Sequence, residues 1–279
     1  HSGYFDVMTT TIPYADVIGD PIAQSKSPLI HKFWLDRLAI EADYRRHHVT
    51  PDELADYIEQ RRSDPAWRGC NVTLPHKIAI MDLVSDPGGV REKIGAMNTI
   101  VRQADGSLIG TNTDAAGFMA PIADTDWSGK HAVVIGAGGA ARAVLFALKQ
   151  VGIGEITFLA RSGLKATGLL MQASVKGSVL PMDARLPEAD LLINASPLGM
   201  TGKAALEVDL DPLPADALVY DLVYAPLETG LLRAAKKRDL AVVDGLDMLI
   251  GQAALAFELF FGATPPMEDD AELRKLLIA

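Results

Sequence analysis

The chain has 279 residues, of which 49% are hydrophobic and 22% charged, which is enough for one large or two modest globular domains. Its formal net charge of −10 argues against a general nucleic-acid-binding protein, because phosphate contacts require clustered Lys and Arg. The single cysteine, Cys70, excludes an intramolecular disulfide, and no apolar run approaches the roughly 20 residues that cross a bilayer. We therefore expect a cytoplasmic protein that binds neither membranes nor nucleic acids.

The first residues lack the features of a signal peptide. His1–Val7 contains neither a basic region nor an apolar stretch. Met8 fits a natural start, which would make His1–Val7 a remnant of an expression vector, and whether these residues are native stays open.

The first third of the chain alternates strand and helix patterns. Runs rich in Val, Ile, Tyr and other β-forming residues predict strands over residues 15–19, 44–49, 70–74, 99–102 and 107–109. Asp105-Gly106, between the last two of these strands, is typical of a hairpin turn. Apolar residues at helical spacing predict helices over residues 27–38 and 51–62.

Both helices carry start signals. We expect Ser27 to cap the first helix, with Pro28 at its first position. Residues 50–53, Thr-Pro-Asp-Glu, match a capping box at the start of the second helix.

From Trp127 onward, short buried strands alternate with helices. The first strand, residues 131–135, leads directly into Gly136-Ala137-Gly138-Gly139 and a helix to about Gln150. Further parallel strands are expected over residues 155–160, 191–194, 218–222 and 241–243. Helices over residues 246–261 and 269–278 have no strand after them, so they should return to cover the first domain. This order predicts an α/β fold with two domains and a cleft between them.

The glycine-rich turn after residue 135 predicts nucleotide binding. Gly136 to Ala141 fit the pattern G-x-G-x-x-A between a strand and a helix. In this pattern the first glycine permits a tight turn and the second lets the backbone approach a pyrophosphate, while the helix N-terminus attracts its charge. The alternative is a tight turn with a purely structural role.

The end of the following strand indicates the cofactor. A dinucleotide site for NAD usually has an acidic residue there, which binds the ribose 2′-hydroxyl. This chain instead has Ala160-Arg161-Ser162 and then Lys165, and these cations suit the 2′-phosphate of NADP. The alternative is a solvated basic loop.

Two further segments each end in a charged residue after a run of small polar groups. They are Asn71-Val72-Thr73-Leu74-Pro75-His76-Lys77 and Gly110-Thr111-Asn112-Thr113-Asp114. A lysine and an aspartate among hydroxyl and amide groups suit proton transfer on a polyhydroxylated substrate. Taken alone, Lys77 would be an exposed lysine at a helix start and Asp114 a helix N-cap, a role that it can also fill beside catalysis.

The chain resembles the shikimate dehydrogenase family from about Val17 to Gly262. The resemblance is carried by an ordered set of segments, which are residues 19–31, 71–77, 95–99, 110–117, 136–142, 194–200, 221–226 and 245–262. It implies NADP-dependent, reversible reduction of 3-dehydroshikimate to shikimate in aromatic amino-acid biosynthesis. It also implies a substrate domain over residues 8–113 plus 247–279 and a Rossmann domain over residues 114–246, with the last helices crossing back.

The resemblance assigns roles residue by residue. Lys77 and Asp114 match the catalytic pair, and Ser25 and Ser27 match the hydroxyls that hold the substrate carboxylate. The other residues that match the substrate site are Thr73, Asn98, Tyr224 and Gln252. The expected cofactor-binding residues are Gly136, Gly138, Gly139, Ala140, Arg161, Ser162, Lys165, Ser196, Met200 and Gly245.

Some features differ from the family pattern or leave alternatives. Lys32 stands where an asparagine is common, and Ala160 replaces a polar residue, which puts in doubt only a helix contact and part of the adenosine contact. The histidines have no metal-ligand spacing, so no metal site is indicated. His76 is expected at a helix start and Cys70 in a buried strand. A quinate/shikimate dehydrogenase using NAD or NADP, and a non-catalytic metabolite sensor, are the alternative functions, and a homodimer stays open.

Overall fold

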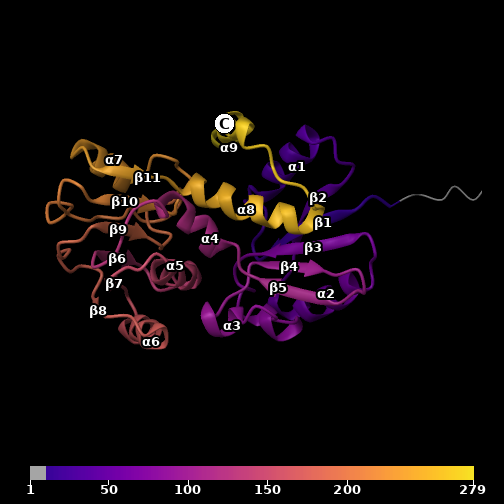
Figure 1. Ribbon diagram of the computed structural model, residues 1–279, viewed down its shortest axis with the longest axis horizontal. Coiled ribbons are helices and arrows are strands. Elements are labelled where there is room, and N and C mark those ends of the chain that lie inside the picture. The colour runs from indigo at the N-terminus through magenta and orange to yellow at the C-terminus, as the bar shows by residue number, and fades with distance from the viewer. Residues whose placement is uncertain (1–10) are drawn as a thin grey trace, which may run out of the picture.

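The computed structural model describes residues 11–279, which form two halves joined by helices (Figure 1). The proposed start at Met8 lies outside the described residues. Each half is built on its own β-sheet. The strands of the first sheet lie between residues 14 and 111, and those of the second between residues 131 and 243. The α/β fold predicted from the alternating patterns is therefore confirmed.

The first sheet is mixed and has the strand order β2-β1-β3-β4-β5. Its strands are β1 (Tyr14–Gly19), β2 (Asp43–His48), β3 (Trp67–Val72), β4 (Thr99–Arg102) and β5 (Leu108–Thr111). The strands β1, β2 and β3 run parallel, while β4 and β5 form the antiparallel hairpin expected around Asp105-Gly106. The predicted third strand was too late in the chain, because the backbone already turns at Thr73, where the His76 N–H donates to the Thr73 carbonyl.

Short helices accompany this sheet. They are α1 (Ser27–Arg37), the 3₁₀ turn η1 (Pro51–Glu53), α2 (Leu54–Arg62), η2 (Ala79–Leu83) and α3 (Val90–Lys93). The predicted capping box is present, since Glu53 accepts a hydrogen bond from the Thr50 N–H at 3.0 Å. The predicted cap at Ser27 was wrong: Lys26 is the capping residue of α1, and Ser27 already lies within the helix. The Ser27 N–H donates instead to Ser25 Oγ at 3.3 Å, so Ser25 satisfies one free donor of the first turn.

The second sheet is fully parallel and has the order β11-β10-β9-β6-β7-β8. Its strands are β6 (His131–Ile135), β7 (Glu155–Leu159), β8 (Gly177–Leu180), β9 (Leu191–Asn194), β10 (Leu218–Asp221) and β11 (Ala241–Val243). Numbered from β6, this is the 3-2-1-4-5-6 order of dinucleotide-binding folds. Strand β8 was not predicted, because its sequence Gly-Ser-Val-Leu is short and half-exposed at a sheet edge.

Alternation along β6 explains why its sequence is a continuous apolar run. Ala132 and Val134 pack in one cluster with α5 (Gly139–Gln150) and α6 (Gly163–Ala173). Val133 and Ile135 face the opposite cluster, which contains α7 (Gly230–Lys237). Because successive side chains point to opposite faces and both faces are covered by helices, every residue of the strand interior is buried.

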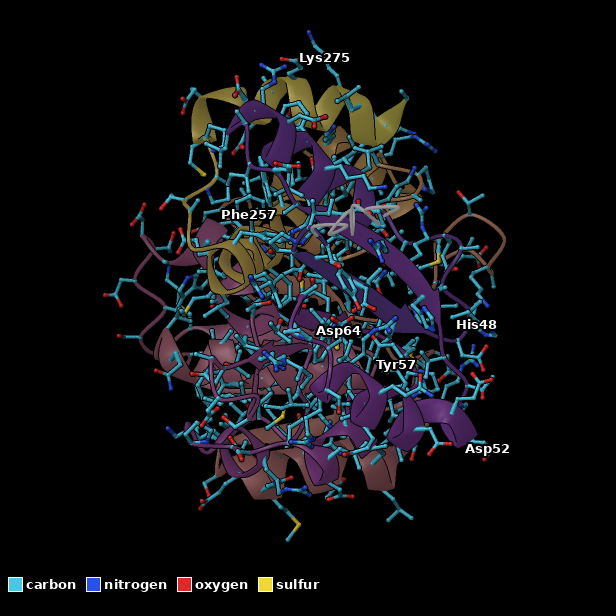
Figure 2. The ribbon with its side chains drawn as sticks, turned by 90° about the vertical axis from the view of Figure 1, so that its right-hand side faces the viewer. His48, Asp52, Tyr57, Asp64, Phe257 and Lys275 are labelled. Carbon is cyan, nitrogen blue, oxygen red and sulfur yellow. The ribbon has the colours of Figure 1, made fainter. Side chains whose placement is uncertain are left out.

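The two halves are joined by α4 (Asp114–Met119), η3 (Ala120–Ile122) and α8 (Gly245–Phe261), followed by η4 (Met267–Asp269) and α9 (Asp270–Ile278). In Figure 1, α8 runs from the second half across to the first, with α9 beside α1. Figure 2 shows the first half end-on, with Lys275 of α9 at the periphery and Phe257 of α8 further in. Phe257 belongs to the same buried cluster as Trp34 of α1 and Leu273 of α9. The predicted return of the last helices is confirmed.

None of the helices between residues 11 and 279 is both long and apolar enough to cross a membrane.

Candidate active site

Two loops meet where β1 and β3 end at the same edge of the first sheet. The Asp20 N–H donates to the Leu74 carbonyl at 3.0 Å, and the Thr73 N–H donates to the Ile18 carbonyl at 3.0 Å. These bonds hold the loop that follows β1, which contains Ser25 and leads into α1 at Ser27, beside the segment that ends at Lys77. Parallel strands bring their carboxyl ends together, so two segments about fifty residues apart in the chain share one edge.

Lys77 and Asp114 form an ion pair in this region. Lys77 Nζ lies 2.6 Å from Asp114 Oδ2, and the two side chains are only 19% and 11% exposed. Lys77 comes from the turn after β3, while Asp114 is the first residue of α4. The contact between Lys77 and Asp114, which the sequence offered only as a possibility, is therefore present. It joins two segments that lie 37 residues apart in the chain.

Asp114 is available for this pair because another residue serves the start of α4. Asn112 Oδ1 accepts hydrogen bonds from the Asp114 and Ala115 N–H groups at 2.9 and 3.2 Å. The Asn112 amide nitrogen also donates to the Ala96 carbonyl at 2.9 Å, which fixes its orientation. Asp114 therefore does not cap α4, the alternative role that its position in the sequence allowed. Its carboxylate still lies in the first turn, where the helix dipole favours a negative charge.

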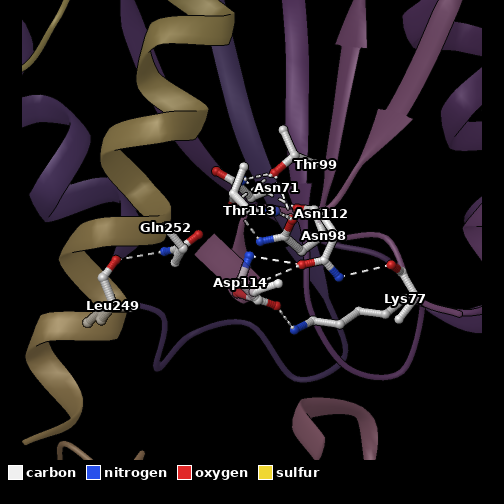
Figure 3. A network of polar contacts seen from close by, with 11 residues as sticks. Asn71, Lys77, Asn98, Thr99, Asn112, Thr113, Asp114, Leu249 and Gln252 are labelled. Carbon is white, nitrogen blue, oxygen red and sulfur yellow. Dashed lines mark hydrogen bonds and ion pairs between the residues drawn. The ribbon is translucent and has the colours of Figure 1, made fainter. Parts of the chain in front are cut away.

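Hydrogen bonds fix the orientation of the Asn98 side-chain amide. Its Oδ1 accepts from the Thr113 N–H at 2.7 Å and from the Thr99 hydroxyl at 3.0 Å. Its amide nitrogen donates to Thr113 Oγ1 at 2.8 Å, which leaves one N–H for a ligand in the cleft. Figure 3 shows this amide beside Lys77 and Asp114, with Gln252 approaching from α8.

Asn71, which sequence reasoning did not single out, contributes to the hydrogen-bond network that holds Asn98. Its Nδ2 donates to Thr99 Oγ1 at 3.0 Å, while its Oδ1 accepts from the Tyr44 hydroxyl at 2.6 Å. Burial raises the pKa of Tyr44 well above its ordinary value, so this hydroxyl stays a donor. The signal in the sequence was an amide between Cys70 and Val72 in a predicted strand, since a buried amide needs hydrogen-bond partners.

The cleft that contains the Lys77–Asp114 pair, called the substrate cleft below after its predicted role, has a volume of about 280 Å³ and lies between the two halves. It is lined by all eight residues predicted for catalysis and substrate binding, which are Ser25, Ser27, Thr73, Lys77, Asn98, Asp114, Tyr224 and Gln252. Lys26, Asn71, Met248 and Leu249 line it as well and were not predicted. Burial raises the pKa of Tyr224 above its ordinary value, so its hydroxyl remains protonated at neutral pH and can donate a hydrogen bond.

Gln252 reaches the cleft because α4 and α8 touch backbone to backbone. A Cβ atom on Gly117 would lie 2.7 Å from the Gln252 nitrogen and 2.9 Å from the Met248 carbonyl oxygen. Only glycine permits this approach. The buried Gln252 side chain donates to the Leu249 carbonyl at 2.9 Å, so its Oε1 remains available to a ligand.

The Gly117→Ala variant is expected to be less stable by about 1–3 kcal/mol, because the added methyl group must push α8 away. Thermal unfolding would measure the loss. The matched control is Gly168→Ala in α6, where an added Cβ meets nothing within 4 Å. That change should stabilise the helix by about 0.5–1 kcal/mol. Equal melting temperatures for the two variants would contradict close packing at Gly117.

A second pocket of about 280 Å³ lies at the carboxyl ends of β6, β7 and β9. Among the residues predicted for the cofactor, it is lined by Gly136, Gly138, Arg161, Ser162, Lys165 and Ser196. Ala140 and Gly245 line the substrate cleft instead, whereas Gly139 and Met200 line neither pocket. The pocket lies at the point where the strand order reverses, which is where such sheets bind nucleotides.

The residues of this pocket fit a dinucleotide with a 2′-phosphate. Gly136 has φ +96°, as the tight turn requires, and a Cβ on Gly138 would meet nothing within 4 Å. The capping residue of α5, Gly138, has no side chain to cap the helix, and the Ala141 N–H donates to the Gly138 carbonyl at 3.2 Å, so the N–H groups of Gly139 and Ala140 are left for a pyrophosphate. Arg161 and Lys165 are exposed beside it, and Ser162 caps α6 by accepting from the Lys165 N–H.

The other predictions concern residues away from the chemistry. Lys32 is exposed and lies 3.8 Å from Asp43, outside both pockets. Cys70 is buried in β3, as predicted. His76, expected at a helix start, lies three residues before η2; its carbonyl accepts from the Ile80 N–H at 2.9 Å, and its Nε2 lies 2.6 Å from the Val49 carbonyl.

Two more observations bear on the assignment. Within residues 11–279, no three His, Cys, Asp or Glu side chains gather as a metal site would require. A larger groove of about 600 Å³ lies between α3, α5 and α6, but it contains none of the predicted residues. We place the site at the smaller cleft because the charged pair and the oriented amides are there.

Comparison with known proteins identifies relatives along nearly the whole chain. A model of the shikimate dehydrogenase substrate-binding domain matches residues 17–100, and one of the shikimate 5′-dehydrogenase C-terminal domain matches residues 245–270. The protein named shikimate dehydrogenase (NADP(+)) from Sphingopyxis alaskensis is 67% identical over 96% of this chain and 97% of its own length.

Solved structures share the fold. Shikimate 5-dehydrogenase from Thermus thermophilus, in complex with NADP(H) and shikimate, is 35% identical with a TM-score of 0.83, covering 95% of this chain and 99% of that chain. The 5-ketofructose reductase of Gluconobacter sp. strain CHM43 is 29% identical with a TM-score of 0.87, again covering 95% and 99%.

Proposed function

The chain belongs to the shikimate dehydrogenase family, and we propose that its cleft catalyses the reversible, NADPH-dependent reduction of 3-dehydroshikimate to shikimate. One observation carries the proposal: the Lys77–Asp114 ion pair shares a cleft with two serines and oriented amides, next to a glycine turn flanked by Arg161 and Lys165. The protein is an NADP-dependent oxidoreductase. The reaction belongs to the shikimate pathway of aromatic amino-acid biosynthesis.

Lys77 handles the proton. NADPH, when bound, supplies the hydride to the carbonyl carbon. As the carbonyl oxygen of the substrate becomes a hydroxyl, Lys77 Nζ donates the proton or hydrogen bond that this oxygen needs, and it accepts one in the reverse direction. Asp114 holds the ammonium group at 2.6 Å and accepts a hydrogen bond from a neighbouring substrate hydroxyl.

The remaining side chains recognise the substrate. Ser25 and Ser27 donate to the carboxylate, while Thr73, Asn98, Tyr224 and Gln252 bind the ring hydroxyls. Because these polar groups are largely buried, a substrate that lacks a matching hydroxyl leaves them unpaired and is rejected. The domain limits, residues 8–113 plus 247–279 and 114–246, stay a prediction.

The direct test measures absorbance at 340 nm when the purified protein oxidises shikimate with NADP, with quinate and with NAD in parallel, and when it is given 5-ketofructose with NADPH in the direction of reduction. The proposal expects the highest kcat/KM for shikimate with NADP. A preference for quinate with NAD would overturn it. Binding of shikimate without turnover would favour a metabolite sensor, which is disfavoured because Lys77 and Asp114 are both present and paired.

Arg161 is expected to select NADP over NAD. In the Arg161→Gln variant, the KM for NADP should rise roughly 10- to 100-fold, because charge-assisted hydrogen bonds to the 2′-phosphate are lost. The KM for NAD should change little. Arg233→Gln, an exposed change on α7, is the control. A parallel rise in both KM values would show that Arg161 does not read the 2′-phosphate.

Compartment and assembly complete the proposal. The single cysteine is consistent with a reducing compartment, and we propose the cytoplasm. Assembly as a homodimer stays a prediction that sedimentation of the purified protein would test.

A further inference from the structure

Two side chains of the edge strand β2 bind the loop between β1 and α1, which contains Ser25, from outside the cleft. Arg46 Nε and Nη2 both donate to the Ser25 carbonyl oxygen, at 3.1 and 2.6 Å. Two residues further along the strand, His48 Nε2 lies 2.7 Å from Asp20 Oδ1 at the start of the same loop. Neither Arg46 nor His48 lines the substrate cleft, so both act on the loop from behind.

The geometry of the strand explains why these two side chains work together. Side chains two residues apart share one face, so Tyr44, Arg46 and His48 all point to the same side of the sheet. Tyr44 is fully buried and stacks on His31 of α1, with ring centroids 4.0 Å apart. Arg46 and His48 are exposed, and they contact the chain just before the start of α1, at Ser25 and Asp20.

Ser25 is held from two sides as a result. Its carbonyl oxygen is fixed by the guanidinium of Arg46, and its Oγ accepts from the Ser27 N–H at 3.3 Å. Since Oγ is occupied as an acceptor, the hydroxyl hydrogen of Ser25 is left to donate into the cleft. The backbone N–H of Ser25 makes only a local turn bond, to the Ile22 carbonyl at 3.0 Å. Arg46 therefore supplies the long-range anchor of this residue.

We propose that Arg46 is a positioning residue for the carboxylate subsite, which it shapes by holding the Ser25 peptide in place. It rests on the proposed function, because it takes Ser25 as a donor to the substrate carboxylate. A guanidinium suits this role because its planar fork presents two parallel donors with little loss of side-chain freedom. The expected consequence is an effect on substrate binding rather than on the chemical step.

The chain provides a matched control in the neighbouring residue. Arg45 belongs to the same strand and is also exposed, but it faces the other way, with Nε 3.0 Å from Asp43 Oδ2. Arg45→Met and Arg46→Met therefore remove the same charge from adjacent positions. Only Arg46→Met removes the contact with Ser25.

Steady-state kinetics of shikimate oxidation would test the inference. In Arg46→Met the KM for shikimate should rise about 5- to 10-fold, the loss expected from a hydrogen bond to a charged group at the surface. Its kcat and its KM for NADP should stay within about twofold, and Arg45→Met should match the original protein. Arg46→Lys keeps the charge without the fork and should recover less than half of the loss. Melting temperatures of the three variants would verify that each is folded.

The outcomes separate the inference from the proposed function. An equal rise in KM for Arg45→Met and Arg46→Met, or full recovery in Arg46→Lys, would mean that charge alone matters and would overturn the positioning role. A flat KM in Arg46→Met while Ser25→Ala raises it would also overturn that role but leave the function standing. If the original protein does not oxidise shikimate with NADP, the proposed function itself fails.

Discussion

Replacing Lys77 with methionine is expected to lower kcat for shikimate oxidation about 10²- to 10⁴-fold, the usual contribution of a positioned acid or base. Methionine keeps much of the length and apolar stem but has no proton to give or take. The KM for shikimate should change only a few-fold, because the proposed substrate contacts are distributed over other residues that line the cleft, such as Ser25, Asn98 and Gln252. The measurement is the initial rate at 340 nm over a range of shikimate concentrations, at saturating NADP.

The matched control for this change is Lys32→Met. Lys32 is exposed, with only a 3.8 Å contact to Asp43, so its loss should leave kcat within about twofold. A Lys77→Met variant that retains most of its kcat while losing shikimate affinity would contradict the catalytic assignment and make Lys77 a binding residue. Calorimetric measurement of shikimate binding to the variant would distinguish a damaged site from an intact but inactive one.

Asp114→Asn is the second change with a large expected effect, a fall in kcat of about 10²-fold. The amide preserves the shape of the side chain but removes the negative charge 2.6 Å from Lys77 Nζ. In a site where both side chains are largely buried, the lysine then loses its only ion-pair partner among the described residues. Its ammonium is no longer held at the position where the substrate oxygen must receive a proton.

A double-mutant cycle would show whether the pair works as a unit. The Lys77→Met and Asp114→Asn changes combined should cost hardly more than Lys77→Met alone, since a positioning partner has nothing left to position. The control is Asp82→Asn, which breaks an equally short pair with Arg91, also 2.6 Å, at an exposed surface. That change should leave kcat unaltered. Fully additive losses at Lys77 and Asp114 would mean that the two residues act independently.

Much of the fold could be predicted because the spacing of apolar residues along the sequence indicates which faces of a strand or helix are buried. The apolar run at His131–Ile135 identified β6, since both of its faces are covered, and the amphipathic and capped segments located most helices. The missed strand β8 has only four residues and little burial, so nothing in its sequence separates it from a loop. Ser27 and Asp114 do not cap their helices, and for a common reason. A small polar residue at a helix start fits several positions equally well, and here Ser25 and Asn112, rather than Ser27 and Asp114, accept hydrogen bonds from the first N–H groups of the two helices.

The candidate site, too, could be predicted from the sequence only in part. The types and order of the polar residues in short segments, together with the glycine turn and the Arg161 loop, were enough to predict NADP as the cofactor and to single out Lys77 and Asp114, which the structure pairs. Only the tertiary structure decided which distant groups contact one another: Asn71, through Thr99, and Thr113 orient Asn98, and Arg46 anchors Ser25. The physical reason is range. Periodicity and turn chemistry act between residues a few positions apart, whereas a hydrogen bond joins atoms that strand pairing and helix packing bring together from distant parts of the chain.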